Sequence, residues 1–197
     1  MLGAENSNAT KLETPHGTAL FHDSVAEVLS TTRSLPIVVR QEDYQLPRAV
    51  EWAADKAIVD AWRQGRRDFD ALKVRLISDL TDAEFAQRPI EVQRTRFSYA
   101  RVTNDLATTS YWSRKERAER LGPWTVPFPD RRLPPLASSE CSNHVGVDTL
   151  TFLTNGALVV GVQSAANAQS PGLLASSGSG SADWADLNPD RARDRVT

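Results

Sequence analysis

The pair Asn155-Gly156 constrains the fold of this chain more than any other feature, because it separates two apolar runs at 145–153 and 157–162. An Asn-Gly connection between strand-like runs is the strongest short-range signal of a β-hairpin, since a type I′ turn requires positive φ at both central residues. Large apolar side chains occur on both faces of the first run, which is typical of strands covered on both sides. The sequence therefore predicts a hairpin in the centre of a sheet.

The composition changes directly after this hairpin. Residues 164–181 are rich in Ser, Ala and Gly and contain a Ser-Pro-Gly turn at 170–172. By composition, the part from 176 to 181 is a flexible linker. The large apolar residues Leu173 and Trp184 flank it and favour burial, which would hold the loop at both ends and let its backbone N–H groups approach a phosphate. The sequence leaves both interpretations open.

The bulk properties exclude several classes of partner. The chain has 23 basic and 25 acidic residues, and the net charge of −2 gives no general attraction to nucleic acid or to an anionic membrane. The single cysteine allows no internal disulfide and suits a reducing compartment. The first residues lack the basic and apolar regions of a secretory signal, and no run approaches the roughly 18 apolar residues of a membrane span. We therefore expect a cytoplasmic protein without membrane contact.

The domain organisation follows from changes in composition along the chain. Residues 1–33 are polar and predict a flexible N-terminal arm with a short helix at 19–29. Residues 34–121 form a mixed α/β region. The segment 122–136 carries five prolines, so it is a proline-rich connector, either an ordered crossover or a polyproline ligand for a partner domain. Residues 137–197 contain the hairpin, and the whole chain is predicted to have an α+β fold.

Hydrophobic periodicity places the elements of the mixed region. Apolar residues at helical spacing predict a helix over 47–63, which begins near a proline and ends at a glycine. Its apolar stripe consists of Val50, Ala54, Ala57, Ile58 and Ala61. Strands are expected at 35–40, within 72–80 and at the start of 90–111, with a helix or turn after the last strand. Short helices are expected at 82–88, at 113–121 and from 188 onward.

Two groups of polar residues permit both a functional and a structural interpretation. His16 and His22 could form a metal-binding pair, but no third ligand lies near them in sequence, which favours two exposed loop residues. Cys141, His144 and Asp148 invite a nucleophile or metal site. Because no second cysteine exists for zinc and His144 begins a strand, capping or packing is favoured. We therefore assign no catalytic residue and no metal ligand.

Two arginine-rich stretches give no strong signal for nucleic acid. Arg63, Arg66 and Arg67 could hold a phosphate, but cations at this position also stabilise a helix C-terminus, and this interpretation is favoured. The stretch 94–101 combines arginine with aromatic residues, as single-strand binders do. It is too short and too weakly basic to predict RNA or DNA binding.

The C-terminal region is similar to a known family. The residues that carry the resemblance are His-Val-Gly-Val at 144–147, the turn at 155–156, the strand at 159–163, the Ser-Pro-Gly-Leu loop at 170–173 and Ser-Gly-Ser-Gly at 177–180. This pattern resembles the front portion of a Nudix-hydrolase-like domain, in a bacterial subgroup with an extra N-terminal region. The resemblance implies that these residues form the opening strands of a Nudix-like mixed sheet, which is either complete or incomplete.

The catalytic motif of that family is absent. The Nudix box, G-x5-E-x7-R-E-U-x-E-E-x-G-U with U a bulky aliphatic residue, supplies glutamates that bind Mg²⁺ or Mn²⁺. After Gly180 the chain contains aspartates at 183, 186, 190 and 194 but no glutamate. The chain is therefore expected to end where the catalytic helix would begin. We expect a truncated or degenerate hydrolase of nucleoside diphosphate-linked compounds that is not catalytically competent, with Mg²⁺ or Mn²⁺ as cofactor only if it is active.

The alternative is a non-catalytic ligand-binding or protein-interaction module on the same scaffold. In either case the expected ligand is a small molecule of nucleotide type, bound where the second strand ends and the polar loop begins. An incomplete sheet would leave an apolar edge exposed, which predicts oligomerisation through that edge. The candidate substrate-binding residues are Gln163, Ser164, Asn167, Ser177, Gly178, Ser179 and Gly180.

Overall fold

The computed structural model describes residues 10–15, 17–21, 23–32, 34–65, 70–80, 88–112, 120–165 and 172–187. The fold is of the α+β class, as the sequence predicts. The helices are α1 (Asp23–Thr31), α2 (Glu51–Arg63) and α3 (Phe97–Arg101), with short 3₁₀ turns η2 (Asn104–Ala107), η3 (Leu136–Ser138) and η4 (Trp184–Leu187). None of the described helices has the length and hydrophobicity that a transmembrane span requires.

The N-terminal part of the chain is more regular than its composition predicts. Strands β1 (Thr10–Thr14) and β2 (Gly17–Phe21) form an antiparallel hairpin, and α1 follows directly. The Thr10 hydroxyl donates a hydrogen bond to the Asp23 carboxylate at 2.6 Å and so ties the hairpin to the helix. Threonine is a good strand former as well as a polar residue, so the polar composition of this segment did not justify the prediction of a flexible arm.

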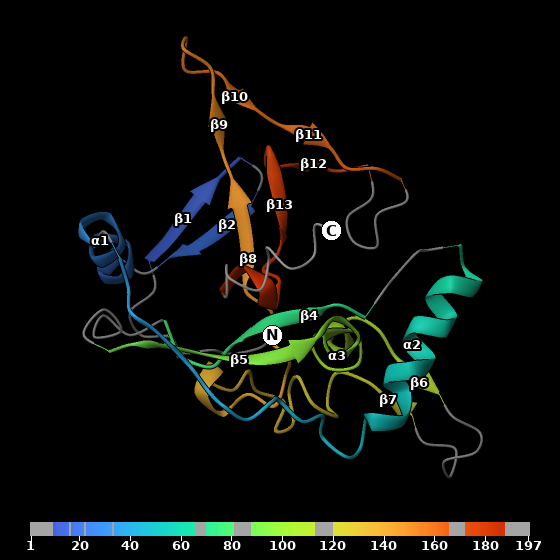
Figure 1. Ribbon diagram of the computed structural model, residues 1–197. Helices are drawn as coiled ribbons and strands as arrows, with labels where there is room; N and C mark the ends of the chain where they lie inside the picture. The colour runs from blue at the N-terminus through green and yellow to red at the C-terminus, as the bar shows by residue number, and fades with distance from the viewer. Residues whose placement is uncertain are drawn as a thin grey trace, which may run out of the picture.

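A three-stranded sheet forms the middle of the molecule (Figure 1). Its order is β3 (Ile37–Val39), β5 (Ile90–Arg96) and β4 (Leu72–Leu76), with β3 parallel and β4 antiparallel to β5. These strands confirm the predictions at 35–40, 72–80 and 90–111, and α3 provides the helix expected after the last of them. Parallel and antiparallel pairing therefore meet in this N-terminal sheet.

The core lies between α2 and the segments that follow β5. Helix α2 turns the predicted stripe inward, with Val50, Ala54, Ala57 and Ala61 buried and Ile58 partly buried. The partners of the helix in the core are Val102, Leu106, Leu121, Val126 and Cys141. Alanines along the contact face allow α2 to approach its neighbours closely, as Figure 1 shows for α2 and α3.

The proline-rich connector is ordered and contributes to this core. Successive turns carry it, with Phe128 N–H donating to Pro123 O and Arg131 N–H donating to Phe128 O, both at 2.9 Å. Val126 is fully buried among the core residues, whereas Trp124 is half exposed. This arrangement matches the crossover interpretation of the segment. Short strands β6 (Tyr111–Trp112) and β7 (Arg120–Leu121) pair just before it.

The second edge of β4 joins the C-terminal part of the chain. Val145 N–H donates to Val74 O and Leu76 N–H donates to Asn143 O, each at 2.9 Å. Val74 N–H donates to Ala182 O at 3.2 Å. Backbone hydrogen bonds therefore connect the residues on the two sides of the proline-rich connector into one ladder.

The strands beyond this ladder are antiparallel and form two-stranded pairs. Strand β8 (Gly146–Thr149) pairs with β13 (Gly178–Ser181), β9 (Thr151–Phe152) with β10 (Leu158–Val159), and β11 (Gly161–Val162) with β12 (Leu174–Ala175). The predicted hairpin is present, but its predicted position in the centre of a sheet is wrong. Every residue from 146 to 162 is exposed, and Figure 1 shows β9 to β12 projecting from the rest of the molecule.

The type of the hairpin turn also differs from the prediction. Gly156 has a positive φ of 82°, and Asn155 is not among the residues with positive φ. Gly156 N–H donates to Leu153 O and Leu153 N–H donates to Ala157 O. This pattern is a three-residue loop that ends in a glycine bulge rather than a type I′ turn. The Asn155 side chain contributes by accepting a hydrogen bond from Ala157 N–H at 3.0 Å.

Several expected elements lie wholly or largely outside the described residues. These are the short helix at 82–88, most of the charged helical turn at 113–121, and the helix expected from 188 onward. His16, His22, Arg66 and Arg67 also lie outside them.

Candidate ligand-binding site

A cavity of about 770 Å³ lies between the α3–η2 segment and the base of the β8–β13 pair. One wall comes from β4, α3 and η3, and the other comes from the start of β8, the residue after β11, and β13. The lining residues are Leu76, Phe97, Ala100, Arg101, Asn104, Asp105, Leu136, Asn143, His144, Gly146, Asp148, Gln163, Ser179, Gly180 and Ser181. The cavity is therefore built from both sides of the ladder that joins β4 to the C-terminal strands.

Two asparagines at the wall of this cavity are joined by two hydrogen bonds. Asn143 N–H donates to Asn104 Oδ1, and Asn104 Nδ2 donates to Asn143 Oδ1, both at 3.0 Å. The backbone donor fixes which atom of Asn104 is oxygen, and this in turn fixes the orientation of the Asn143 amide. Asn143 Nδ2 is then left buried without a hydrogen-bond partner in the described part of the chain. A buried donor without a partner is costly, and Nδ2 lies behind the open surface of the cavity, because it has almost no accessible area.

The segment that carries Asn143 is held from several sides. Ser142 is fully buried, its N–H donates to Thr103 Oγ1 at 3.1 Å, and its hydroxyl shares a 2.7 Å hydrogen bond with Thr95. Thr103 is also fully buried, and its hydroxyl donates to Tyr99 O at 2.6 Å. Asn143 has a φ of 37°, which asparagine tolerates better than most residues. The unsatisfied donor is therefore fixed in position before any ligand arrives.

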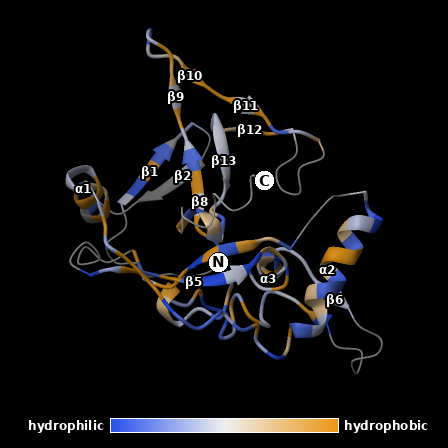
Figure 2. Cartoon of the chain, in the orientation of Figure 1, coloured by the Kyte–Doolittle hydropathy of each residue, from blue (hydrophilic) through white to orange (hydrophobic). Residues whose placement is uncertain are grey.

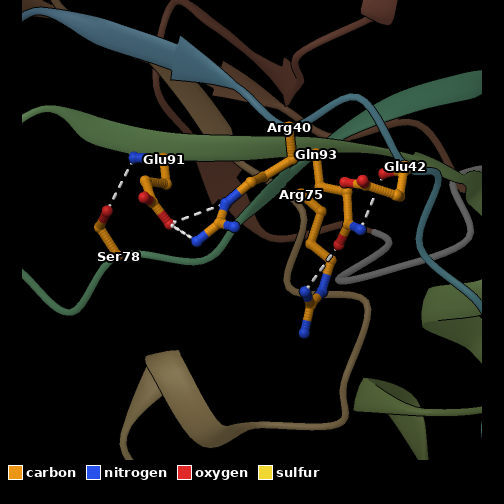
Figure 3. A network of polar contacts seen from close by, with 6 residues as sticks. All are labelled: Arg40, Glu42, Arg75, Ser78, Glu91 and Gln93. Atoms are coloured by element: carbon orange, nitrogen blue, oxygen red, sulfur yellow. Dashed lines mark hydrogen bonds and ion pairs between the residues drawn. The ribbon is translucent and has the colours of Figure 1, made fainter.

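A buried arginine, whose contact with Gln93 is shown in Figure 3, holds the residues just before this segment. Arg75 donates to Ser139 O at 2.7 Å, to Cys141 O at 2.9 Å and to Gln93 Oε1 at 2.9 Å. Gln93 in turn donates to Glu42 O at 2.9 Å. The alternation of β4 places Arg75 away from solvent, because loop 139–141 covers that face of the sheet. Only 8% of its surface is exposed, and burial lowers the pKa of its guanidinium.

His144 presents a neutral imidazole to the cavity. Its Nε2 lies 3.2 Å from Arg96 O, and a carbonyl only accepts, so Nε2 carries the proton. Burial is the largest influence and lowers the pKa of His144, as do the charges of Lys73 and Arg101, whereas the hydrogen bond with Arg96 O and the charge of Asp105 raise it. In the neutral ring Nδ1 then bears a lone pair and can accept a hydrogen bond. The ring also packs against Phe97, with 6.3 Å between centroids.

The positive and negative charges of the residues that line the cavity do not cancel. Arg101 forms an ion pair with Asp105 at 2.9 Å, and the Arg101 guanidinium lies 5.0 Å from the centroid of the Phe97 ring. Asp148 adds a second carboxylate, which accepts a hydrogen bond from Ser176 at 2.8 Å. With one arginine, two aspartates and a neutral histidine, the described lining carries a net charge of −1. Such a site attracts cationic groups, repels anions and has no net charge interaction with uncharged groups.

The structure brings three of the predicted ligand-binding residues together. Gln163, Ser179 and Gly180 all line the cavity, although Gln163 lies after β11 and the other two lie in β13. Residues from the end of the second apolar run and from β13 therefore line the same cavity.

The other predicted residues have different positions. Ser177 bridges the hairpin, because its hydroxyl donates to Val159 O at 2.7 Å and accepts from Thr151 N–H at 3.0 Å. Gly178 pairs with Thr149 in the β8–β13 ladder. Ser164 is exposed and is not part of the cavity lining, and Asn167 lies outside the described residues. The stretch 176–181 is thus a strand and its lead-in, not a flexible linker.

Cys141 and His144 do not form a nucleophile site. The Cys141 side chain is buried in the core beside α2, whereas His144 faces the cavity. Burial raises the pKa of the Cys141 thiol, which disfavours the thiolate that a nucleophile needs.

The described acidic residues do not fit a magnesium or manganese centre. Asp183 pairs with Lys73 at 2.6 Å, and Asp186 accepts a hydrogen bond from Asp183 N–H at 2.8 Å. Within the described ranges, no three His, Cys, Asp or Glu residues gather closely enough to hold a metal ion. Asp190 and Asp194 lie outside these ranges. Metal-dependent hydrolysis therefore stays a prediction from the sequence.

Sequence reasoning missed the residues of the α3–η2 wall. Arg101 and Asn104 precede Asn143 by about forty positions, and no spaced motif links them. The one local signal was the asparagine directly before His144, since asparagine is enriched at positions with positive φ. A tertiary contact of this range cannot be inferred from local periodicity.

Comparison with known proteins gives no match. No family model matches the chain, and no curated protein or solved structure matches it either.

Proposed function

We propose that this protein is a non-catalytic ligand-binding module whose cavity takes a small, uncharged ring compound of nucleoside type. The observation that carries the proposal is the cavity itself, which joins an apolar wall to polar side chains and has no excess of positive charge. His144 lines the same cavity and can act as an acceptor in its neutral form. A nucleobase edge offers donors as well as acceptors, so it can pair with such a group.

The size and composition of the cavity support a ligand with one or two rings. About 770 Å³ lies within the usual range of roughly 300–1,000 Å³ for small-molecule sites. Leu76, Phe97 and Leu136 give an apolar surface against which a flat ring can pack. Gln163 and Ser179 add polar groups on the opposite wall, where the hydroxyls of a sugar would find partners.

The charge of the cavity distinguishes a nucleoside from a nucleotide. The arginine is already paired with Asp105, and Asp148 faces the same space. A diphosphate would bring two or three further negative charges close to these carboxylates. The proposal therefore departs from the nucleoside diphosphate-linked compounds that the Nudix resemblance implies, while the Nudix-like scaffold remains a prediction that rests on residues 144–180.

Calorimetric titration of the full chain with matched probes tests the proposal. Adenosine and uridine serve as uncharged probes, and ADP and UDP serve as their charged counterparts. We expect at least one nucleoside to bind roughly tenfold or more tightly than its diphosphate, because of the unfavourable charge. Tighter binding of the diphosphates, or no binding of any probe, would overturn the proposal. Hydrolysis of the diphosphates with Mg²⁺ or Mn²⁺ would instead support the enzyme prediction.

A matched pair of substitutions shows whether the cavity is the site. Asn143→Asp keeps the oxygen that Asn104 contacts and adds a negative charge to the lining of the cavity. Asn155→Asp makes the same change in the hairpin turn and keeps the acceptor that Ala157 N–H uses. We expect the first variant to weaken nucleoside binding by about tenfold or more, and the second to leave it unchanged. Equal effects of the two variants would place the ligand elsewhere.

A further inference from the structure

The projecting strands β9 to β12, here called the apolar ribbon, expose an unusual amount of hydrophobic surface. Eight large apolar side chains of the apolar ribbon are between 37% and 73% exposed, among them Phe152 at 62%, Val162 at 73% and Leu174 at 70%. Figure 2 shows hydrophobic colouring along β10 and β11, away from the body of the molecule. Contiguous apolar patches of this kind mark interaction surfaces.

The area is large enough for a stable interface. At roughly 100 Å² for each of these eight side chains, the apolar ribbon exposes about 800 Å² of apolar surface over its two faces, and a standard interface takes about 800 Å² from each partner. Covering the apolar ribbon would thus provide a large part of an interface.

The apolar ribbon carries no charge that would select a different partner. No Asp, Glu, Lys or Arg occurs in the sequence from 149 to 182. Charged side chains are the usual means by which proteins prevent exposed strands from pairing with their own copies. A surface without charges neither repels an identical surface nor attracts an oppositely charged one, so charge complementarity with a foreign protein has no basis here.

We propose that the apolar ribbon is a dimerisation surface and that its occupant is a second copy of this chain. The two ribbons pack face to face about a twofold axis and cover each other's apolar side chains. In such a twofold contact each copy uses the same surface, so association stops at the dimer. The cavity lies at the base of the ribbon and not on its projecting part, so the dimer is independent of the proposed ligand-binding function.

Measurement of molar mass in solution tests the proposal. Light scattering coupled to size exclusion is applied to the full chain over a wide concentration range. We expect a dimer whose dissociation does not increase with salt, because the contact is apolar and salt screens only charges. A monomer at every concentration would overturn the proposal, and so would open-ended growth to larger species.

A matched set of lysine substitutions locates the contact. Phe152→Lys and Val162→Lys place a charge on the apolar ribbon, and both side chains are exposed, so the monomer tolerates the change. Leu133→Lys is the control, because Leu133 is 69% exposed outside the ribbon. We expect the ribbon variants to raise the dimer dissociation constant roughly 100-fold and the control to leave it unchanged.

The test also separates loss of the dimer contact from unfolding of a variant. Thermal melting of each variant at low concentration confirms that the monomer is folded, and a variant that does not melt cooperatively is replaced by the milder Phe152→Ser. A dimer that survives in folded ribbon variants would overturn the assignment of the interface.

Discussion

The guanidinium of Arg75 lies over the ring of Tyr44, with its Cζ atom 4.6 Å from the ring centroid. The two side chains hold the same loop from two sides, because Tyr44 donates to Glu140 O at 2.5 Å while Arg75 donates to Ser139 O and Cys141 O. The hydrogen bonds described for Arg75 all go to neutral acceptors, so carbonyl dipoles and an aromatic face stabilise the cation. This pair therefore orders the loop that leads into Asn143 and the candidate cavity.

Replacing Arg75 by methionine should destabilise the protein strongly. The change keeps much of the side-chain volume but leaves buried carbonyls of loop 139–141 without their donor, which costs about 3 kcal/mol of unfolding free energy. Urea denaturation measures this loss. Arg40→Met is the matched control, since Arg40 forms an exposed ion pair with Glu91 and should lose no more than about 1 kcal/mol. Equal losses in the two variants would contradict the structural role of Arg75.

Gly156→Ala should weaken the hairpin, because Gly156 has a φ of 82°. A side chain in this region of backbone space costs about 1 kcal/mol, although no atom lies within 4 Å of the added methyl group. Amide hydrogen exchange at Leu153, whose N–H pairs across the turn, detects the change as faster exchange. Gly161→Ala, also in the ribbon and also with open space around it, is the control and should leave this exchange rate nearly unchanged.

The regular elements of the central region could be predicted because their signals are local. The stripe that includes Val50 and Ala61 fixed the face of α2 that packs inward, and the alternation in 72–76 fixed a strand. Alternation did not reveal that Lys73 and Arg75 are buried, because the loop and strand segments that cover them come from beyond residue 130. Periodicity reports which side chains share a face, not what covers that face.

The same distinction explains the outcome for the C-terminal strands. Apolar residues on both faces predicted covered strands, but the described part of the chain supplies no layer over Phe152 or Val162. In the candidate site, Gln163 and Gly180 could be predicted because the sequence changes there from an apolar strand to a polar loop. Asn104 could not be predicted, because its contact with Asn143 depends on the long-range pairing of β4.

Cys141 should react slowly with thiol reagents in the folded protein. The side chain is 5% exposed, and burial raises the pKa of the thiol, so little thiolate is present at pH 8. We expect alkylation by iodoacetamide to be at least roughly tenfold slower than in urea, where the thiol regains its ordinary pKa. Mass spectrometry follows the reaction, and the unfolded chain provides the internal control. A native rate equal to the rate in urea would show that Cys141 is accessible.

His144 should make the stability of the protein depend on pH below about 6.5. Burial lowers the pKa of His144 from its ordinary value of 6.5, so between the folded-state and unfolded-state pKa values the unfolded chain binds more protons. The contribution of His144 is therefore fully present above pH 6.5 and is lost as the pH falls through that window. The slope for one such group reaches at most about 1.4 kcal/mol per pH unit.

The variant His144→Gln isolates this effect. Glutamine retains an N–H group that can donate to Arg96 O, as Nε2 does, but it does not titrate. His16 and His22 remain in both proteins, so the difference between the two pH profiles of unfolding free energy belongs to His144 alone. We expect the wild-type profile to fall more steeply than the variant profile below pH 6.5, and the two to run parallel above it. Parallel profiles over the whole range would mean that the imidazole is not desolvated, and that the neutral acceptor assigned to the cavity is absent.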